Sequence, residues 1–536
     1  MNYKVKNLGI MLDCSRNAVI TPKTLKKYIP LLSKMGYNEL QLYTEDTLLI
    51  DSEPYFGYLR GGYTESEIKE IILECDKFGI EVIPCVQTLG HMERALKQPV
   101  YAEYADTHNV LMTDDEKVYS FIEKIFSNAR KLFKSNKINI GMDEAYLVGF
   151  GNHFKRFGYQ SKEEIMRRHL KRVASIAEKY SFTAMMWSDM FFDVGENGQQ
   201  YIIREDAKAE IPANITPVYW DYYRTCEQHY IEHIKAHEGL KKDDLCFAAG
   251  AWSWVGFVPK NEHAFETFLP AISACRKTGV TDLYITVWGD NGAECPYAAI
   301  FPALCYFAEA ARGVTDINAV KEKFKAVFGT DMDDFMLYDS INGVGVNKDP
   351  VQNPSKYMLY NDVFLGRFDC TVEENDAKEF KDIADKLKPL TSNADYVWMF
   401  NMGYYLARAL SVKCDLGIRT RSAYLSGDKS ALNALLADYD KTAEYITDFY
   451  YAFENAWHFE KKPFGFEVQE VRLSGLIGRI KACKRKLKKY LDGKIDKIEE
   501  LEVKILDYSG AGEIKKRKKL VVNDWADNIT TGSAGF

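Results

Sequence analysis

Eight short apolar runs of β-type composition alternate with helical patterns through the first 290 residues. The runs predict strands at residues 8–13, 39–44, 81–86, 137–142, 183–187, 215–220, 245–249 and 283–288. Amphipathic stretches between them include residues 21–34, 64–78, 114–133, 162–179 and 262–277. Parallel strands that are covered by helices are apolar on both faces, so this alternation predicts an α/β fold, a (β/α)8 TIM barrel. A doubly wound sheet is disfavoured because no strand is followed by a GxGxxG or GxxxxGK loop.

The pattern becomes helical throughout after residue 312. Helices are expected near residues 319–328, 377–387, 396–410 and 432–456. A stripe at near-heptad spacing follows, made of Leu473, Leu476, Ile480, Cys483, Leu487 and Leu491. After Gly493, the apolar residues 498–506 predict a second helix that faces this stripe in an antiparallel pair. We therefore expect a catalytic barrel at residues 1–312 and an all-helical C-terminal domain at residues 313–536.

Charge and cysteine usage exclude several classes of protein. The 70 basic and 77 acidic residues give a net charge of −7, so nothing favours nucleic acid or an anionic membrane as a partner. The N-terminus lacks a signal-peptide pattern, and no run of eighteen apolar residues occurs. The 11 cysteines are scattered without a CxxC pair, which is typical of reduced thiols. These observations predict a soluble cytoplasmic protein.

Polar and aromatic residues follow the predicted strands, where a barrel places its active site. They are Asp13, Ser15 and Arg16; Thr44, Glu45 and Asp46; Gln87 and His91; Asp143 and Glu144; Trp187 and Asp189; Trp220, Asp221, Tyr222 and Tyr223; Trp252 and Trp254; and Trp288, Asp290 and Glu294. Five of the 8 tryptophans lie at these strand ends. Aromatic side chains can stack on the apolar faces of sugars.

The Asp143-Glu144 pair is the strongest catalytic candidate. It follows the buried run 138–142, and adjacent strand residues point to opposite faces, so both carboxylates can face one pocket only where the strand breaks. Burial and mutual repulsion would then raise one pKa and leave the other carboxylate charged, as general acid chemistry requires.

Other kinds of chemistry have weaker candidates. No GxSxG turn follows a strand, and no cysteine has an obvious His and Asn arrangement. His229, His233 and His237 have metal-ligand spacing on one probable helix, but they lie among Glu and Lys residues. We expect them on a solvated helix face, with neither a metal nor a cofactor.

Several motifs resemble glycoside hydrolase family 20, the exo-acting β-N-acetylhexosaminidases. IGMDEAYLVGFG is similar to that family's motif at the end of the fourth strand, in which Gly-x-Asp-Glu ends the strand. YLRGGYTESEIKEIILECDKFGIEVIPCVQTLGH is similar to its run into the third strand and the Gly-His that follows. The resemblance covers residues 7–310. GMDEA, WGDNGAE and the KPFGFEVQEVRLSGL segment look most like the bacterial branch active on N-acetylglucosaminides and N-acetylgalactosaminides.

The resemblance implies exo-hydrolysis of a non-reducing terminal β-linked N-acetylhexosamine (GlcNAc or GalNAc) by substrate-assisted retention. Glu144 would match the general acid, and Asp143 the residue that orients the 2-acetamido group while its carbonyl oxygen attacks C1. The partner would be an oligosaccharide or glycoconjugate, with an oxazolinium intermediate and no enzyme nucleophile.

The resemblance also implies a set of substrate-binding residues. Trp187, Trp220 and Trp288 match aromatic walls, and Trp252 joins them as an aromatic strand end. Asp290 matches an acidic position for the C4 or C6 hydroxyl, and Glu294 could join it. His91 matches a histidine near the acid, and Tyr222, with Tyr223 as the alternative, would bond the acetamido carbonyl.

One position departs from the family pattern. Many members have an Arg just before the glycine of the first strand, where this chain has Leu8. Recognition of the C3 and C4 hydroxyls would then come from Arg16, Glu45 or Asp46.

Two other functions and two assembly states remain open. A barrel glycosidase could use two separated carboxylates among Asp13, Asp189 and Glu294 on sugars without an acetamido group. A non-catalytic carbohydrate-binding barrel would show a substituted acid, whereas Glu144 is present. The apolar stripe of the tail needs a covering surface, which favours a homodimer over a monomer whose tail folds back on its own barrel.

Overall fold

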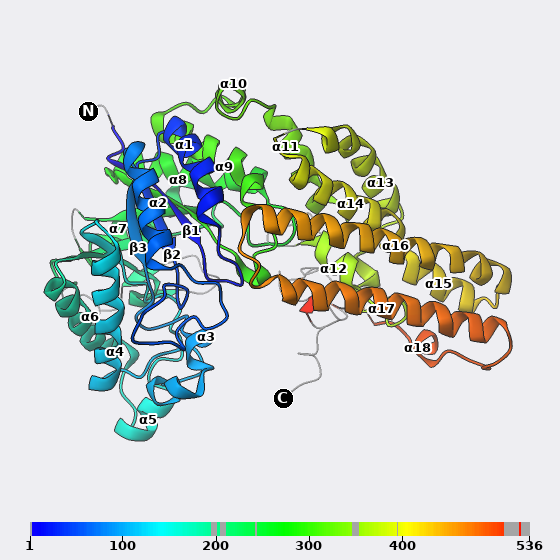
Figure 1. The fold of residues 1–536 in the computed structure, drawn as a ribbon, viewed down its shortest axis with the longest axis horizontal. Helices are drawn as coiled ribbons and strands as arrows, with labels where there is room; N and C mark the ends of the chain where they lie inside the picture. The colour runs from blue at the N-terminus through cyan, green and yellow to red at the C-terminus, as the bar shows by residue number, and fades with distance from the viewer. Residues whose placement is uncertain are drawn as a thin grey trace. The chain divides into compact units, whose positions relative to one another are not determined.

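The computed structural model describes residues 3–194, 201–203, 211–241, 244–345, 353–393, 395–506, 508 and 525–526. The chain forms two compact units (Figure 1). The barrel unit comprises Met1–Trp252, Glu262–Gly289 and Ala303–Gly329. The helical unit comprises Ser253–Asn261, Asp290–Pro302 and Thr330–Phe536. The helical unit therefore takes in two loops that precede it in the sequence, whereas a single cut was expected after residue 312; that domain division stays a prediction.

The barrel unit contains a closed parallel barrel, which confirms the predicted fold class. Its strand order is β1-β10-β9-β8-β5-β4-β3-β2. The strands are β1 (Asn7–Asp13), β2 (Glu39–Tyr43), β3 (Glu81–Cys85), β4 (Lys137–Asn139), β5 (Thr183–Trp187), β8 (Ile215–Trp220), β9 (Cys246–Gly250) and β10 (Asp282–Val287). The parallel pairing of β1 with β10, with Leu8 opposite Leu283, closes the barrel. A separate antiparallel pair, β6 (Phe192–Val194) and β7 (Tyr201–Ile203), lies outside this sheet.

Helices surround the barrel as the amphipathic stretches predict. They are α1 (Pro22–Met35), α2 (Glu65–Lys77), α4 (Glu116–Leu132), α6 (Lys162–Lys179), α7 (Glu227–His237), α8 (Asn261–Thr278), α9 (Phe301–Arg312) and α10 (Ile317–Phe328). The Thr21 side chain caps α1, and Thr64 forms a capping box with Glu67 at the start of α2. Short helices α3 (Glu93–Leu96) and α5 (Asn152–Phe157) lie in the loops after β3 and β4.

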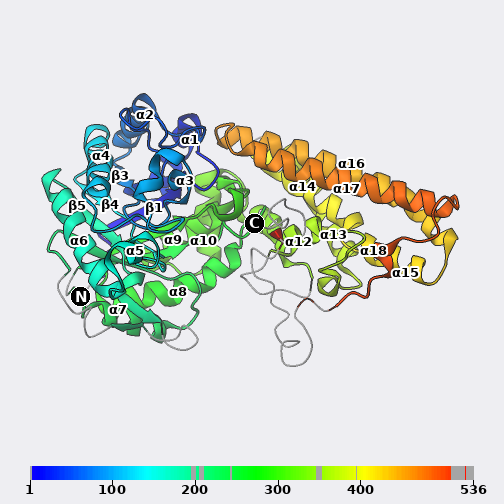
Figure 2. The same ribbon diagram turned by 90° about the horizontal axis from the view of Figure 1, so that it is seen from below.

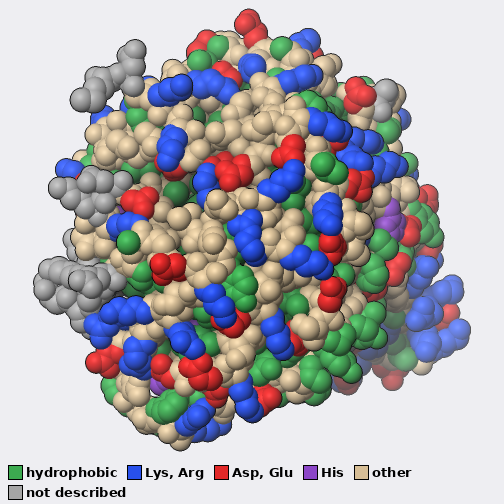
Figure 3. Space-filling view, turned by 60° about the vertical axis from the view of Figure 1, so that its left-hand side comes forward, with side chains coloured by type: hydrophobic (Ala, Val, Ile, Leu, Met, Phe, Trp, Pro, Cys, Tyr) green, Lys and Arg blue, Asp and Glu red, His purple; other side chains and the backbone are tan. Residues whose placement is uncertain are grey.

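The outward face of the barrel helices carries charges of both signs. Figure 3 shows basic and acidic side chains interspersed on this face. Between α4 and α6, Arg172 pairs with Glu116 at 2.5 Å and Lys179 with Glu123 at 2.5 Å. Exposed pairs of this kind contribute about 0–1 kcal/mol each, so burial of the apolar faces stabilises these helices more than the pairs do.

The helical unit is built around two long helices, α16 (Lys429–Glu460) and α17 (Phe466–Leu491), which lie side by side (Figure 2). The other helices are α11 (Met332–Asp339), α12 (Pro354–Tyr360), α13 (Asp376–Leu387), α14 (Val397–Lys413), α15 (Leu416–Leu425) and α18 (Glu499–Glu502). The predicted pairing of the α17 stripe with a helix over residues 498–506 is wrong. Helix α18 is a single turn, and Val503 and Leu506 are exposed, so the stripe on α17 packs against α16 instead.

A buried carboxylate links three strands near the beginning of the barrel. Glu39 is buried and accepts hydrogen bonds from the Lys137 ammonium and the Tyr284 hydroxyl. Burial raises the pKa of Glu39, and the Lys137 charge opposes this shift. Lys137 also pairs with the more exposed Glu81 at 3.0 Å.

We predict that Glu39→Ala lowers the free energy of unfolding by about 2 kcal/mol, because it removes the carboxylate that accepts from the buried Tyr284 hydroxyl and leaves Glu81 as the carboxylate beside the Lys137 ammonium. Glu81→Ala removes the other carboxylate from the same ammonium and should cost about 0–1 kcal/mol. Urea unfolding followed by tryptophan fluorescence measures both values. Equal losses in the two variants would show that the buried carboxylate of Glu39 stabilises the barrel no more than the more exposed carboxylate of Glu81 does.

Candidate active site

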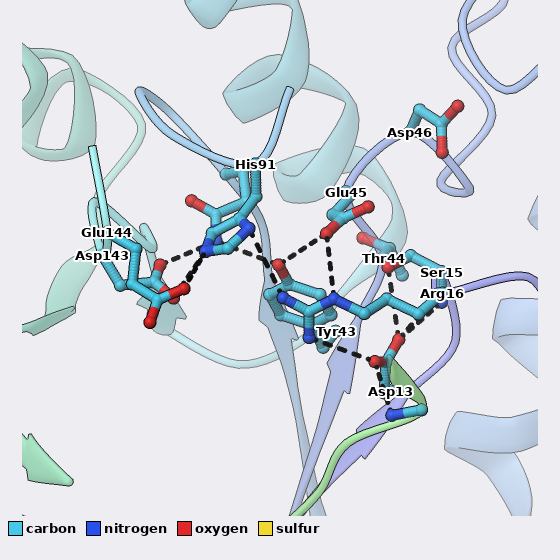
Figure 4. A network of polar contacts seen from close by, with 12 residues as sticks. Asp13, Ser15, Arg16, Tyr43, Thr44, Glu45, Asp46, His91, Asp143 and Glu144 are labelled. Carbon is cyan, nitrogen blue, oxygen red and sulfur yellow. Dashed lines mark hydrogen bonds and ion pairs between the residues drawn. The ribbon is translucent and has the colours of Figure 1, made fainter. Parts of the chain in front are cut away.

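The chain after β4 leaves the extended conformation just before the two candidate carboxylates. Gly141, Met142 and Glu144 have φ values of 71°, 75° and 51°. Left-handed φ is strained for residues other than glycine, and such strain collects at functional sites. This turn of the backbone lets the two adjacent carboxylates point to the same side. His91 Nε2 lies 3.1 Å from Asp143 Oδ2 and 3.6 Å from Glu144 Oε2 (Figure 4). Both carboxylates therefore reach the same imidazole, as a broken strand allows.

Two neighbouring side chains fix the backbone and the Asp143 carboxylate. Gln87 Nε2 donates to Asp143 Oδ1 at 2.8 Å, and Gln87 Oε1 accepts from the Met142 N–H at 3.2 Å. Asp189 Oδ2 accepts the Glu144 N–H at 3.0 Å. Gly90 passes so close that an added Cβ would lie 2.5 Å from the Asp143 carbonyl oxygen. The carboxylate of Glu144 is more exposed than that of Asp143, with 43% against 9% of the side chain accessible.

The His91–Asp143 contact shifts both ionisations. Burial disfavours the charged imidazolium, but the Asp143 carboxylate outweighs it and raises the pKa of His91 to about 9. Burial alone would raise the pKa of Asp143, yet the His91 charge and the Gln87 hydrogen bond hold it below its usual value. Asp143 is therefore a carboxylate and His91 an imidazolium at neutral pH.

Arg16 lies at the centre of a second cluster that joins the first through His91 (Figure 4). Its guanidinium is 3.4 Å from Asp13 Oδ2, 3.9 Å from Glu45 Oε1 and 3.4 Å from His91 Nδ1. It also lies over the Trp288 ring, 4.7 Å from the centroid. Arg16 thus brings a fixed positive charge among the carboxylates that follow β1 and β2.

Asp13 and Asp46 have structural partners of their own. Asp13 accepts the N–H groups of Ser15, Arg16 and Gly289 at 2.9–3.0 Å, which ties the ends of β1 and β10 together. Asp46 is buried and pairs with Arg60 at 3.4 Å, and Figure 4 shows it apart from Asp143 and Glu144. The sugar contact predicted for Asp46 stays a prediction.

The aromatic residues of the strand ends form one connected cluster in the barrel unit. The Trp187 and Trp288 rings are 6.0 Å apart, and Tyr43 meets Trp288 edge-on at 4.8 Å. Trp288 Nε1 donates to the Tyr222 hydroxyl at 3.0 Å, and Trp220 stacks on Tyr222 at 5.1 Å. The Trp252 indole donates to the Tyr222 carbonyl at 2.9 Å. Tyr222 thus touches three of the predicted tryptophans, whereas Tyr223 is 45% exposed.

Asp189 contacts both the loop that carries Asp143 and Glu144 and the aromatic cluster. Its Oδ2 takes the Glu144 N–H and its Oδ1 accepts from Trp220 Nε1 at 3.2 Å. Burial, reinforced by the nearby Asp143 charge, raises the pKa of Asp189 to about 7. The sequence places Gln87 and Asp189 after predicted strands but assigns no role to Gln87, and it offers Asp189 only as a possible second carboxylate; their support of the Asp143-Glu144 backbone was not predicted.

Asp290 and Glu294 belong to the helical unit, not to the barrel unit. Glu294 is buried, with Oε2 2.7 Å from Lys356 Nζ and Oε1 3.4 Å from Arg472 Nη1. Trp254 also lies in the helical unit. The predicted sugar contacts of Asp290 and Glu294 stay predictions.

The predicted solvated face of α7 is wrong for two of its three histidines. His233 and His237 are buried, and only His229 is half-buried. His233 Nδ1 lies 2.9 Å from the Tyr219 hydroxyl, and His237 Nε2 lies 2.7 Å from Ser188 Oγ. The Lys and Glu neighbours in the sequence occupy the other face of the helix. Within the described residues, no group of three or more His, Cys, Asp or Glu side chains is arranged to hold a metal ion.

Comparison with known proteins gives matches over most of the chain. Residues 7–233 match the glycosyl hydrolase family 20 catalytic domain, and residues 333–521 match the Glycoside Hydrolase 20C C-terminal domain. Hexosaminidase D of Bos taurus is 31% identical over 219 residues, 38% of this chain and 60% of the bovine protein. Hexosaminidase D of Homo sapiens is 30% identical over 219 residues, 38% of this chain and 43% of the human protein. The chain thus spans less than two thirds of the length of either relative.

A comparison with solved structures also gave matches. The X-ray structure of Flavobacterium johnsoniae chitobiase has 14% sequence identity and a TM-score of 0.48, and the match covers 84% of this chain and 78% of that chain. Along the described part of the chain, no helix is both long and apolar enough to cross a membrane.

The His91–Asp143 contact predicts a pH-dependent contribution to stability. Because the pKa of His91 in the folded protein is raised above its ordinary 6.5, the contribution is complete below pH 6.5 and is lost as the pH rises through about 9. The stability difference between wild type and His91→Gln should therefore be on the order of 3 kcal/mol at pH 6 and shrink toward zero above pH 9. Urea unfolding across this pH range checks it. A difference that stays constant would show that the ion pair does not carry the effect.

Proposed function

We propose that this chain, which belongs to glycoside hydrolase family 20, removes a terminal β-linked N-acetylhexosamine from the non-reducing end of an oligosaccharide or glycoconjugate. The observation that carries the proposal is the contact of Asp143 and Glu144 with one imidazole, at the broken end of β4. Two carboxylates in different environments, one paired and buried and one more exposed, are what acid-assisted glycoside cleavage needs. The names of the relatives, Hexosaminidase D, agree with this activity.

Glu144 acts as the general acid. Its more exposed side chain can protonate the glycosidic oxygen as the bond from that oxygen to C1 breaks. The Asp189 carboxyl holds the Glu144 N–H and so keeps the acid in its left-handed backbone conformation. Glu144, then a carboxylate, later removes a proton from the water that attacks C1.

Asp143 stays ionised and orients the 2-acetamido group of the sugar. The acetamido carbonyl oxygen attacks C1 while the leaving group departs, and the positive charge of the resulting oxazolinium is stabilised by the Asp143 carboxylate. Because the nucleophile is part of the substrate, the reaction uses intramolecular proximity in place of an enzyme nucleophile. Water then opens the ring from the face that the leaving group vacated, so the anomeric configuration is retained.

The aromatic cluster supplies the walls of the sugar site. Trp187, Trp220 and Trp288 stack on apolar faces of the sugar, and Tyr222 or Tyr223 bonds the acetamido carbonyl. Because Leu8 stands where many family members have an arginine, Arg16, which follows β1, takes over part of the hydroxyl recognition. Asp290 binds the C4 or C6 hydroxyl. The sugar can be GlcNAc, GalNAc or both.

The carboxylates needed for an acetamido-independent glycosidase are already engaged. Asp13 accepts three backbone N–H groups, and Asp189 accepts from Glu144 and from the Trp220 indole. Such contacts favour structural roles for both, and they support the substrate-assisted mechanism over one with two separated carboxylates.

We further propose a cytoplasmic location and a homodimer. All eleven cysteines are free, which suits a reducing compartment. In the helical unit, Tyr451 of α16 and Val471 of α17 are 56% and 71% exposed, and a second copy could cover them.

We predict that Glu144→Gln lowers kcat on unactivated β-N-acetylhexosaminides by orders of magnitude, because leaving-group protonation is lost. The loss should be much smaller with a leaving group that departs without a proton. Steady-state rates on p-nitrophenyl β-GlcNAc, β-GalNAc and β-glucoside, beside an unactivated disaccharide, measure this. Normal turnover of the disaccharide would show that the acid is misassigned.

A second prediction concerns Asp143. A thiazoline mimic of the oxazolinium should inhibit wild type strongly and Asp143→Asn far less, because the charge that stabilises the bound mimic is gone. Inhibition constants for both proteins, with unfolding curves to confirm that the variant is folded, provide the test. Equal inhibition would overturn the substrate-assisted role.

The proposed dimer is tested by light scattering at micromolar concentration. We expect about twice the monomer mass of 61.5 kDa, and we expect Val471→Glu to shift the mass toward the monomer. A single wild-type mass near 61.5 kDa would remove the dimer.

A further inference from the structure

The loop that follows Trp288 and Gly289 folds as part of the helical unit, and its backbone is strained. Asn291, Gly292 and Ala293 have φ values of 61°, 119° and 52°, so three successive residues are left-handed. Left-handed φ costs on the order of 1 kcal/mol or more at each residue other than glycine, and it persists only where surrounding groups hold it.

Side chains of the helical unit form hydrogen bonds with successive carbonyl and N–H groups of this loop. Lys356 Nζ and Arg472 Nη1 donate to the Asn291 carbonyl at 3.3 and 3.4 Å, and Gln469 Nε2 donates to the Gly292 carbonyl at 3.4 Å. Lys461 Nζ donates to the carbonyls of Ala293 at 2.5 Å and Cys295 at 3.0 Å. Glu460 accepts the N–H groups of Tyr297 and Ala298 at 2.7 and 2.9 Å.

The groups that hold the loop are buried and mostly charged. Lys356, Glu460 and Gln469 are fully buried, and Lys461 is 3% exposed. Glu294 lies between Lys356 and Arg472 and balances their charge, while the Trp525 ring covers the Lys356 ammonium at 3.9 Å. Buried ions contribute little net stability compared with apolar residues of similar size. Stability alone therefore does not account for two buried lysines and a buried glutamate that all contact one loop.

We propose that the helical unit serves substrate binding, with Lys461, Glu460 and Lys356 as positioning residues that fix the loop and so place Asp290. The inference rests on the proposed function, in which Asp290 binds a sugar hydroxyl. Asp290 is the first residue of this loop, directly before the three left-handed residues. A change in the dihedral angles of these three residues therefore moves the Asp290 carboxylate. It leaves Asp143 and Glu144 in place, because they belong to the loop after β4.

The test compares Lys461→Met with the control Lys484→Met. Both remove one ammonium from the helical unit, but Lys484 pairs with Asp440 at the surface. On p-nitrophenyl β-GlcNAc, Lys461→Met should raise KM about tenfold or more with little change in kcat, because hydrogen bonds to the charged donor are lost. Lys461→Arg should restore part of the loss, and Lys484→Met should match wild type. An unchanged KM in a folded Lys461→Met would overturn the proposal.

A double-mutant cycle distinguishes positioning from general damage. If Lys461 acts through Asp290, then adding Lys461→Met to Asp290→Ala should raise KM by less than about threefold beyond Asp290→Ala alone. Independent, multiplicative effects would overturn the proposal. If Lys461→Met does not fold, Gln469→Leu replaces it in the cycle. This variant removes one bond to Gly292 and should raise KM severalfold.

Hydrogen exchange separates the inference from the proposed function. Peptides that cover residues 289–302 should exchange faster in Lys461→Met than in Lys484→Met, whatever the enzyme hydrolyses. A wild type inactive on every β-N-acetylhexosaminide refutes the proposed function and with it the role of the loop in binding. Activity with unchanged exchange and unchanged KM refutes the inference alone.

Discussion

The contact between His91 and two neighbouring carboxylates is the interaction on which the candidate site depends. Two acidic groups that follow one another in the chain repel each other when they face one pocket, and burial makes their charges more costly. The positive charge of the His91 imidazolium offsets both the repulsion between the carboxylates and the cost of burying their charge. The imidazolium reaches Asp143 and Glu144 through one ring nitrogen. Arg16, which lies near the other ring nitrogen and repels the imidazolium, is itself paired with Asp13 and Glu45. Gln87 and Asp189 then hold the strained backbone that lets both carboxylates point the same way.

The fold was predictable from local patterns, because period, capping and strand composition are properties of neighbouring residues. The eight strands, the caps at Thr21 and Thr64 and the helical second half all follow from such signals. The pairing of α17 was not predictable. Its stripe is compatible with any apolar partner, and α16 rather than residues 498–506 covers it because the chain after Gly493 forms only one helical turn.

Within the site, residues at strand ends were predictable and their partners were not. Asp143, Glu144 and His91 come together because parallel strands end on the same side of the barrel. By contrast, the partner of Glu294 is Lys356, more than sixty residues later, and Asp46 is paired with Arg60 at the far end of the loop between β2 and α2. His233 and His237 looked solvated because their sequence neighbours are charged, yet a helix has two faces and these histidines lie on the inner one. Such pairings depend on tertiary contacts that single-sequence patterns do not encode.

The discontinuous make-up of the helical unit limits how this architecture can change during evolution. Two of its three segments, Ser253–Asn261 and Asp290–Pro302, are interleaved with barrel segments in the chain. A gene fusion or domain exchange after residue 330 would replace the helices but leave behind the two loops that fold with them. The incoming helices would then have to supply buried polar and charged groups that fit the two retained loops, whose conformation was selected with the original helices. The two units are therefore expected to be inherited together, and substitutions in the loops and in the helices should accumulate as correlated pairs.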